Sequence, residues 1–263
     1  SATSMAARGT TVRGSTREPR RSMRRITRLP YAAVVSTTLP LFPLNTALVP
    51  GLVLPLHIFE PRYRALIEEL LAIPDEDARE FGIIAVRDGR DLARHGADAL
   101  YPIGTATVLR QAERLPDGRF DIVTTGSRRF RLENVDLSQP LARAEVEFLD
   151  DPTEPDDAII GAQVAWRFRA YRAALGGQVV ADDDGAIPPD PDDGMPDDPT
   201  VLSYLVTAAM VLPGDERQQL LAAPTTHDRL TLARGLLRRE TTLISALGAL
   251  PAIELPGAEP SVN

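Results

Sequence analysis

The sequence predicts an α+β protein in which a β-rich part comes first and a helical part follows. Residues 39–150 contain several short apolar or alternating runs separated by glycine and proline turns, a pattern typical of a small barrel or sandwich. After Asp150 the apolar residues recur at intervals of three and four, which is helical spacing. A length of 263 residues with 43% hydrophobic residues suffices for one large domain or two small ones.

The first expected strands, residues 39–44 and 52–59, both contain proline. Because proline cannot donate a ladder hydrogen bond, we expect these strands at sheet edges or bulges. Pro61 suits the first position of a helix that ends at Pro74. The apolar residues of this helix fall on one stripe, Tyr63, Leu66, Ile67, Leu70 and Leu71.

The remaining strand signals are of two kinds. Residues 81–86 form a continuous apolar run, which indicates a buried central strand. Further strands are expected at residues 103–109, 120–125, 129–135 and 142–149. Pro116-Asp117-Gly118 predicts a hairpin turn, and Gly126-Ser127 predicts a turn between two strands.

The second half is expected to be helical at residues 158–175, 199–212, 215–222 and 228–247. Thr225 or Thr226 is expected to cap the last helix. Eight Asp, five Pro and no basic residue in 178–199 predict a disordered acidic loop within the helical part. Its aspartates suggest calcium, but the EF-hand spacing is absent, so a linker is the favoured interpretation.

Charge and missing residue types exclude several functions. The sequence has neither Lys nor Cys, which excludes a P-loop lysine, a Ser-Lys dyad, disulfides and thiolate zinc sites. The lack of Cys fits a reducing cytoplasm, the expected location, and no apolar run approaches the roughly 20 residues that cross a bilayer. Residues 1–38 are basic and are interpreted as a disordered leader or an artificial extension, with a transit peptide as the alternative. Residues 251–263 are interpreted as a tail.

One family resemblance is carried by the segments Leu41–Leu44, Val49–Gly51 and Leu54–Arg64. They resemble the opening of the substrate-binding N-terminal domain of Lon proteases, and Phe59-Glu-Pro-Arg-Tyr-Arg64 is the most specific block. Gly104–Val108 and Asp121–Arg131 are similar to later strands of that family. The resemblance covers about residues 39–250 and looks like a stand-alone bacterial member.

The resemblance implies a PUA-like β-barrel with an inserted helix over residues 39–150. A C-terminal helical bundle would then occupy residues 151–250. It also implies non-catalytic binding of unfolded polypeptide or of a protein partner, as an adaptor in protein quality control, without ATP or a cofactor. The alternatives are a nucleic-acid-binding module of the same fold and an enzyme acting on a small molecule.

One basic cluster favours the nucleic-acid alternative, namely Arg128, Arg129 and Arg131. The body of the chain is acidic, since residues 40–150 carry 13 Arg against 18 acids and residues 151–263 carry 8 Arg against 18 acids. A body of this charge would repel phosphate backbones, which argues against nucleic acid.

Candidate site residues are few. The three histidines show no triad or metal spacing, so we predict no catalytic, cofactor or metal residue, and His57 is expected to be a hydrogen-bonded, partly buried strand residue. Arg62 is one candidate for binding, although Glu60 and Arg62, two apart, would not face each other on a helix. Trp166 and Tyr171 are the others. With Phe168 they form either an apolar groove or, as the spacing favours, the core of a helix.

Overall fold

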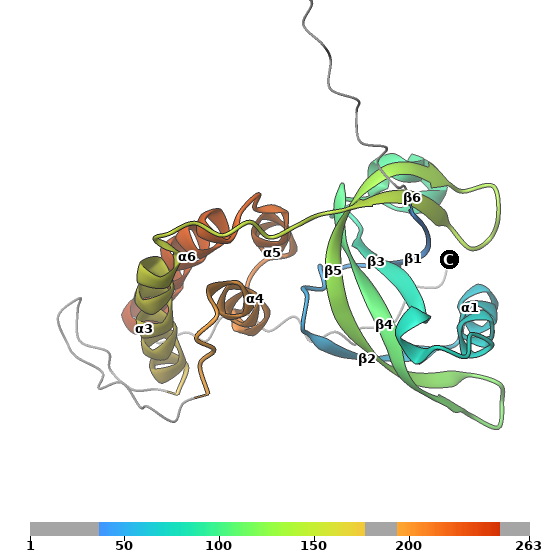
Figure 1. Ribbon diagram of the computed structural model, residues 1–263, viewed down its shortest axis with the longest axis horizontal. Helices are drawn as coiled ribbons and strands as arrows, with labels where there is room; N and C mark the ends of the chain where they lie inside the picture. Colours follow the sequence, from blue (N-terminus) through green and yellow to red (C-terminus); the bar gives the residue numbers. More distant parts are fainter. Residues whose placement is uncertain (1–36, 177–193, 248–263) are drawn as a thin grey trace, which may run out of the picture. The chain divides into compact units, whose positions relative to one another are not determined.

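The β-rich part is one six-stranded sheet in the order β2-β5-β4-β3-β1-β6 (Figure 1). Its strands are β1 (Thr37–Leu44), β2 (Val53–Ile58), β3 (Glu80–Ala85), β4 (Ile103–Arg114), β5 (Phe120–Asp136) and β6 (Arg143–Phe148). The computed structural model describes residues 37–176 and 194–247. The expectations for the leader up to residue 36, for loop residues 178–193 and for the tail lie outside these ranges.

Strand pairing runs in a circuit. Besides its pairing with β4, β5 pairs with β6, and β6 pairs with β1, so the path β1–β3–β4–β5–β6 returns to β1. The 17 residues of β5 make this possible, because its first part pairs with β2 and its last part with β6. Strand β2 stands outside the circuit and pairs with β5.

The expected turn at Gly126-Ser127 is wrong, because β5 runs without interruption through both residues. Gly126 donates its N–H to Leu52 O at 3.0 Å, and its own carbonyl accepts from Gly51 N at 2.9 Å. A Cβ at Gly126 would lie 2.5 Å from Val49 O. The glycine therefore marks a close approach of the 49–52 loop to the strand rather than a turn.

The expected edge position is confirmed for β2 and wrong for β1, which lies between β3 and β6. Residues Thr37–Pro40 of β1 pair with β6, whereas Leu41–Leu44 pair with β3. Each half of β1 thus has one hydrogen-bonded neighbour. The missing N–H groups of Pro40 and Pro43 can therefore face an unpaired side of the strand.

Helix α1 (Pro61–Leu71) covers one part of the sheet. Tyr63, Leu66, Ile67 and Leu70 are buried in a cluster with sheet residues such as Phe81 and Ile122, which confirms the predicted stripe except for Leu71 at its margin. Three short elements were not expected from the sequence: η1 (Glu76–Ala78), α2 (Leu92–His95) and η2 (Gly96–Ala99). They connect β3 to its neighbours and have little apolar periodicity.

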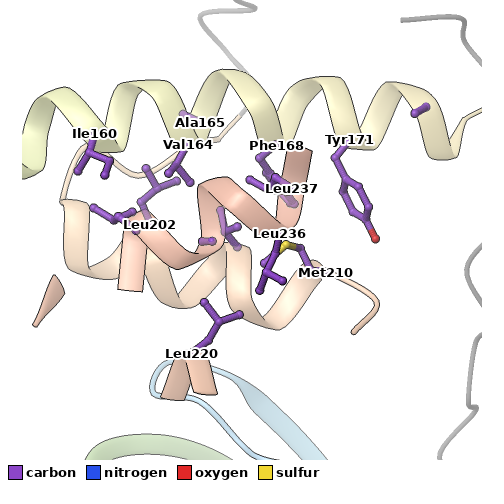
Figure 2. Close-up of a cluster of buried hydrophobic side chains, with 14 of the residues drawn as sticks. Ile160, Val164, Ala165, Phe168, Tyr171, Leu202, Met210, Leu220, Leu236 and Leu237 are labelled. Atoms are coloured by element: carbon purple, nitrogen blue, oxygen red, sulfur yellow. The ribbon is translucent and has the colours of Figure 1, made fainter. Parts of the chain in front are cut away.

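The helical part consists of α3 (Asp157–Leu175), α4 (Pro199–Ala209), α5 (Gly214–Ala222) and α6 (Thr226–Leu247). Figure 2 shows Leu202 of α4 and Leu237 of α6 beside side chains of α3, and Leu220 of α5 on the other side of the same apolar cluster. The Asp198 carboxylate caps α4 by accepting from Val201 N at 2.9 Å. Thr225 Oγ1 accepts from Asp228 N at 3.0 Å, which decides between the two expected caps of α6.

A buried ionic cluster joins the sheet to the helices, which belong together to one compact unit. Arg129 of β5 is 1% exposed and donates to Leu221 O at 2.9 Å and Ala223 O at 2.7 Å, at the end of α5. Arg229 of α6 is fully buried as well. Both guanidinium groups lie 2.7 Å from the same carboxylate oxygen of Asp151. One carboxylate therefore serves two buried cations.

Tyr204 completes this cluster. Its hydroxyl donates to the Asp151 carboxylate at 2.7 Å, and the Arg229 guanidinium lies 4.1 Å from the centre of its ring. Burial raises the pKa of the Tyr204 hydroxyl well above its ordinary value, so the hydroxyl stays a neutral donor. Burial also holds the pKa of Arg129 below its ordinary value, with repulsion from Arg229 acting in the same direction.

Replacing the shared carboxylate, Asp151→Asn, is expected to lower the free energy of unfolding by about 3–5 kcal/mol. The amide keeps the shape but leaves two buried guanidinium groups without a counter-charge. Equilibrium urea denaturation measures the effect. Glu113→Gln, at an exposed position of β4, is the matched control and should shift the free energy of unfolding by less than about 0.5 kcal/mol. Equal midpoints for the two variants would contradict this role of Asp151.

Candidate functional site

Strand β2 presents a row of exposed side chains. Val53 is 55% exposed and Phe59, just after the strand, is 49% exposed, and Pro55 and His57 between them are exposed too. We call these four residues the β2 outer row. The alternate residues Leu54 and Leu56 pack against the cluster under α1, because successive side chains of a strand point to opposite faces. The row therefore exposes two large apolar side chains on one face of an edge strand.

Among the described strands, β2 has a pairing partner on one side only. The bond from Gly126 N to Leu52 O fixes the alternation of the antiparallel pair, and the same register continues along β2. Even-numbered residues therefore bond to β5, and Val53, Pro55 and His57 turn their backbone groups outward. Among the described residues no strand pairs with that side. Pro55 has no N–H, which removes one donor from the middle of this edge.

His57 is held in one orientation by its neighbours. Its Nδ1 lies 2.6 Å from Asp121 Oδ1, and its Nε2 lies 3.0 Å from Nη1 of Arg119. Since Arg119 can only donate, Nε2 accepts and Nδ1–H donates to Asp121, which assigns the neutral tautomer. The expected hydrogen bonding is confirmed, but the expected partial burial is wrong, because the side chain is 44% exposed. The imidazole lies 6.5 Å from the Phe59 ring, so the two form one surface.

The block that follows the row fixes where α1 begins. Glu60 is the residue before the helix and has an extended backbone, with φ of −66° and ψ of 135°. Its carboxylate therefore reaches the Arg62 guanidinium at 2.7 Å, and the expectation that these two side chains do not meet is wrong. Arg62 also lies 4.6 Å from the centre of the Tyr63 ring. Burial raises the pKa of Tyr63, whose ring packs 4.2 Å from that of Phe42.

The candidate residues from the sequence lie in different surroundings. Arg62 is exposed at the start of α1, three residues after Phe59, and its Nη1 donates to Pro140 O at 3.5 Å. Tyr171 is fully buried, and its hydroxyl accepts from Val211 N at 3.1 Å, so with Phe168 it belongs to the helical core (Figure 2). Trp166 is half-buried, with the Arg167 guanidinium 5.5 Å from its ring. Binding by Arg62 or Trp166 stays a prediction, and Tyr171 could bind a partner only after the core opens.

The basic cluster on β5 is engaged within the protein. Arg128 lies 3.4 Å from a Glu80 carboxylate oxygen and stacks 3.7 Å above the Phe148 ring. Arg131 pairs with Glu147 at 2.6 Å, and Arg129 is buried. Each of the three cations therefore has a partner and contributes little free positive charge to the surface.

The described residues contain no group of three His, Cys, Asp or Glu side chains that could hold a metal ion. Nor does the described part of the chain contain a helix that is both long and apolar enough to cross a membrane.

The family model for the ATP-dependent protease La (LON) substrate-binding domain matches residues 38–239. The chain belongs to this family. The segment that matches the Lon substrate-binding domain contains the β2 outer row, α1 and most of the helical part. The expected family membership is thereby confirmed.

Curated relatives and solved structures agree with this assignment. Lon protease 2 of Syntrophobacter fumaroxidans is 28% identical over 190 residues, which are 71% of this chain and 22% of that protein. Lon protease of Escherichia coli is 23% identical over 211 residues, 78% of this chain and 25% of that protein. The chain thus spans about a quarter of the length of the curated relatives it matches.

The fold is that of Lon N-terminal domains. The N-terminal domain of Mycobacterium avium complex Lon protease has a TM-score of 0.54 and 19% identity, covering 78% of this chain and 98% of that one. A Lon N-terminal domain protein from Xanthomonas campestris has a TM-score of 0.52 and 22% identity, covering 77% of this chain and 98% of that one. The predicted mixed α+β class is confirmed.

The exposure of Val53 and Phe59 was not foreseen from the sequence. The signal was present, because Val53, Pro55, His57 and Phe59 stand at alternate positions in a run with an internal proline. The buried pair Arg129 and Arg229 was missed as well. For this pair no local signal exists, since the bonds of Arg129 reach residues more than 90 positions away.

Gly126→Ala is expected to lower the free energy of unfolding by about 1–3 kcal/mol, because the new Cβ would crowd Val49 O in the loop that leads into β2. Gly235→Ala is the matched control, since Gly235 is exposed within α6 and a Cβ there meets no atom within 4 Å. This control should raise the free energy of unfolding by about 0.5–1 kcal/mol. Urea denaturation of both variants checks the predicted opposite signs, and a change of the same sign in both would refute the packing argument.

Proposed function

We propose that this chain binds unfolded or partly unfolded polypeptide without catalysing a reaction on it, as an adaptor in protein quality control. The observation that carries the proposal is the β2 outer row, with Val53 exposed on the strand and Phe59 exposed just after it, while no described strand pairs with the outer side of β2. Membership in a family named for substrate binding supports it. Binding of this kind requires neither ATP nor a cofactor.

The chemistry of the surface suits weak, exchangeable recognition of apolar chain. Phe59 and Val53 are each about half exposed, so burying the rest of each side chain on contact contributes roughly half of the ~1.5–3 kcal/mol that full burial of such a side chain contributes. Strand addition to β2 would contribute few backbone bonds, because Pro55 offers a carbonyl but no N–H. Side-chain contacts would therefore supply most of the affinity.

We also propose that the circuit of paired strands is a PUA-like barrel and that α3 to α6 form a C-terminal bundle. In this description α1 is the inserted helix that closes the barrel over the cluster of Leu66 and Phe81. The nucleic-acid alternative has no observation in its favour, since the cations of the β5 cluster are already paired.

The double variant Val53→Ser, Phe59→Ser is expected to weaken binding about tenfold, a loss of about 1.4 kcal/mol. The probe is fluorescein-labelled lactalbumin, reduced and carboxymethylated so that it stays unfolded, and fluorescence anisotropy gives the dissociation constant. Both side chains are exposed, so the fold should tolerate the change. Ile159→Ser is the control, because Ile159 is 66% exposed on α3, away from β2.

Equal losses in the double variant and in Ile159→Ser would show that β2 is not the site. A labelled single-stranded RNA is titrated in parallel. Binding to the RNA alone, falling steeply with salt, would replace the proposed function by the nucleic-acid alternative.

A further inference from the structure

A second surface feature lies apart from the β2 outer row. A pocket of about 560 Å³ opens between the segment 87–102, which contains α2 and η2, and the last part of β5. Its polar lining comes from Arg87, Arg90, Asp98, Tyr101, Glu133 and Asn134. None of these residues belongs to the surface proposed above, and the function proposed there does not use them.

Arg87 is held at this pocket with most of its donors unused. Its Nε donates to Leu100 O at 3.1 Å, and its guanidinium lies 4.6 Å from the centre of the Tyr101 ring. These two contacts fix the plane of the guanidinium. In the part of the chain that the structure describes, neither Nη group has a partner. A fixed guanidinium with two free Nη groups matches the two oxygens of a carboxylate.

Arg90 lies in the same lining, and its Nη1 donates to the backbone carbonyl of Asp98 at 3.3 Å. Neither Arg87 nor Arg90 forms an ion pair with a described carboxylate, and of the other arginines of the sheet part only Arg64 shares this property among the described residues. The ten that do form one are Arg62, Arg79, Arg94, Arg110, Arg114, Arg119, Arg128, Arg129, Arg131 and Arg143. In so acidic a chain, two cations left without a carboxylate at one pocket indicate an anionic ligand.

The opposite wall supplies acceptors. The pairing of β5 with β6 shifts register between Leu132 and Asn134, which makes Glu133 the extra residue of a β-bulge. Glu133 and Asn134 are both exposed and line the pocket. With Asp98, they set two carboxylates and an amide against the two guanidinium groups. These carboxylates would repel a phosphate, which carries nearly two negative charges, but they accept hydrogen bonds from N–H donors.

The end of a polypeptide offers both kinds of group, a single carboxylate and the backbone N–H groups of the residues before it. We propose that this pocket binds the C-terminal residues of a polypeptide, with Arg87 and Arg90 holding the terminal carboxylate. Glu133 and Asn134 accept from the preceding backbone N–H groups, and the side chains of Leu132 and Val135 give the pocket apolar contact. The proposal rests on the proposed function, because it specifies which end of a bound polypeptide the protein recognises.

The test compares two ten-residue peptides of one sequence ending in Leu-Val-Leu, both labelled with fluorescein at the N-terminus. One has a free C-terminal carboxylate and the other a C-terminal amide. Anisotropy titration of the full chain should show that the free carboxylate binds about tenfold more tightly, since a charge-assisted bidentate pair is lost in the amide. Arg87→Gln and, separately, Arg90→Gln should each reduce this ratio toward one.

Arg94→Gln is the matched control, because Arg94 lies in the same segment, has a side chain 84% exposed, and pairs with Asp91 at 3.8 Å. It should keep the tenfold preference. The carboxylate and amide peptides are also compared on the wild-type protein, where no variant is involved, so a folding defect in a variant cannot produce the preference for the carboxylate. A carboxylate preference that Arg87→Gln and Arg90→Gln both retain would overturn the proposal.

The same experiment separates this proposal from the proposed function. Equal binding of the two peptides, or binding of the unfolded lactalbumin but of neither peptide, would overturn the C-terminal pocket and leave the proposed function standing. If neither peptide nor the unfolded lactalbumin binds, both proposals fall.

Discussion

Two buried guanidinium groups that share one carboxylate hold the helices of this protein to its sheet. A buried cation is tolerated when its donors are bonded, and Arg129 and Arg229 meet this demand largely with backbone oxygens from the end of α5, Leu220, Leu221 and Ala223. Those carbonyls belong to the last turn of α5 and to Ala223, the residue after it, where oxygens lack the usual bond to an N–H four residues on and carry partial negative charge. One set of contacts therefore gives the carbonyl oxygens at the end of α5 hydrogen-bond donors and gives the two buried guanidinium groups acceptors. One donor of the cluster stays unbonded, because Arg129 Nε is buried without a partner among the described residues.

The position of the β2 outer row depends on this ionic cluster. Tyr204 and Leu221 belong to the helices of the ionic cluster, and their side chains pack in an apolar cluster with Ala47 and Val49 of the loop before β2. That loop in turn lies so close to β5 that only glycine fits at position 126. From there the bond between Gly126 and Leu52 sets the register of β2, and the register decides which residues face outward. The exposed row is thus fixed by contacts on the opposite side of the strand.

Local patterns predicted most of the elements but few of the contacts between them. The stripe on α1 apart from Leu71, Pro61 at the first position of this helix and the edge position of β2 follow from spacing and residue type within a short window, and these expectations hold. Gly126 was misinterpreted because a turn and a close backbone approach both select glycine, and only the three-dimensional position of Val49 separates them. Glu60 and Arg62 were misinterpreted for a related reason, since the pairing rule for helices does not apply to a residue just before the helix. Arg129 stands in the sequence as part of a basic cluster, and its burial follows from carbonyls contributed by a distant helix.

An exposed apolar edge strand favours pairing with other copies of the chain as well as with the proposed polypeptide ligand, and the residues of β2 limit such pairing. The strand is six residues long, and Pro55 interrupts the row of donors on its free side. The same proline leaves side-chain burial as the main attraction, and burial of Val53 and Phe59 carries no information on the direction in which a bound chain runs. A carboxylate held by the fixed Arg87 guanidinium is directional, because only one end of a polypeptide carries that group. In the proposed mode, the outer row supplies affinity for any apolar segment, and the pocket at the β5 bulge selects segments that lie at a chain end.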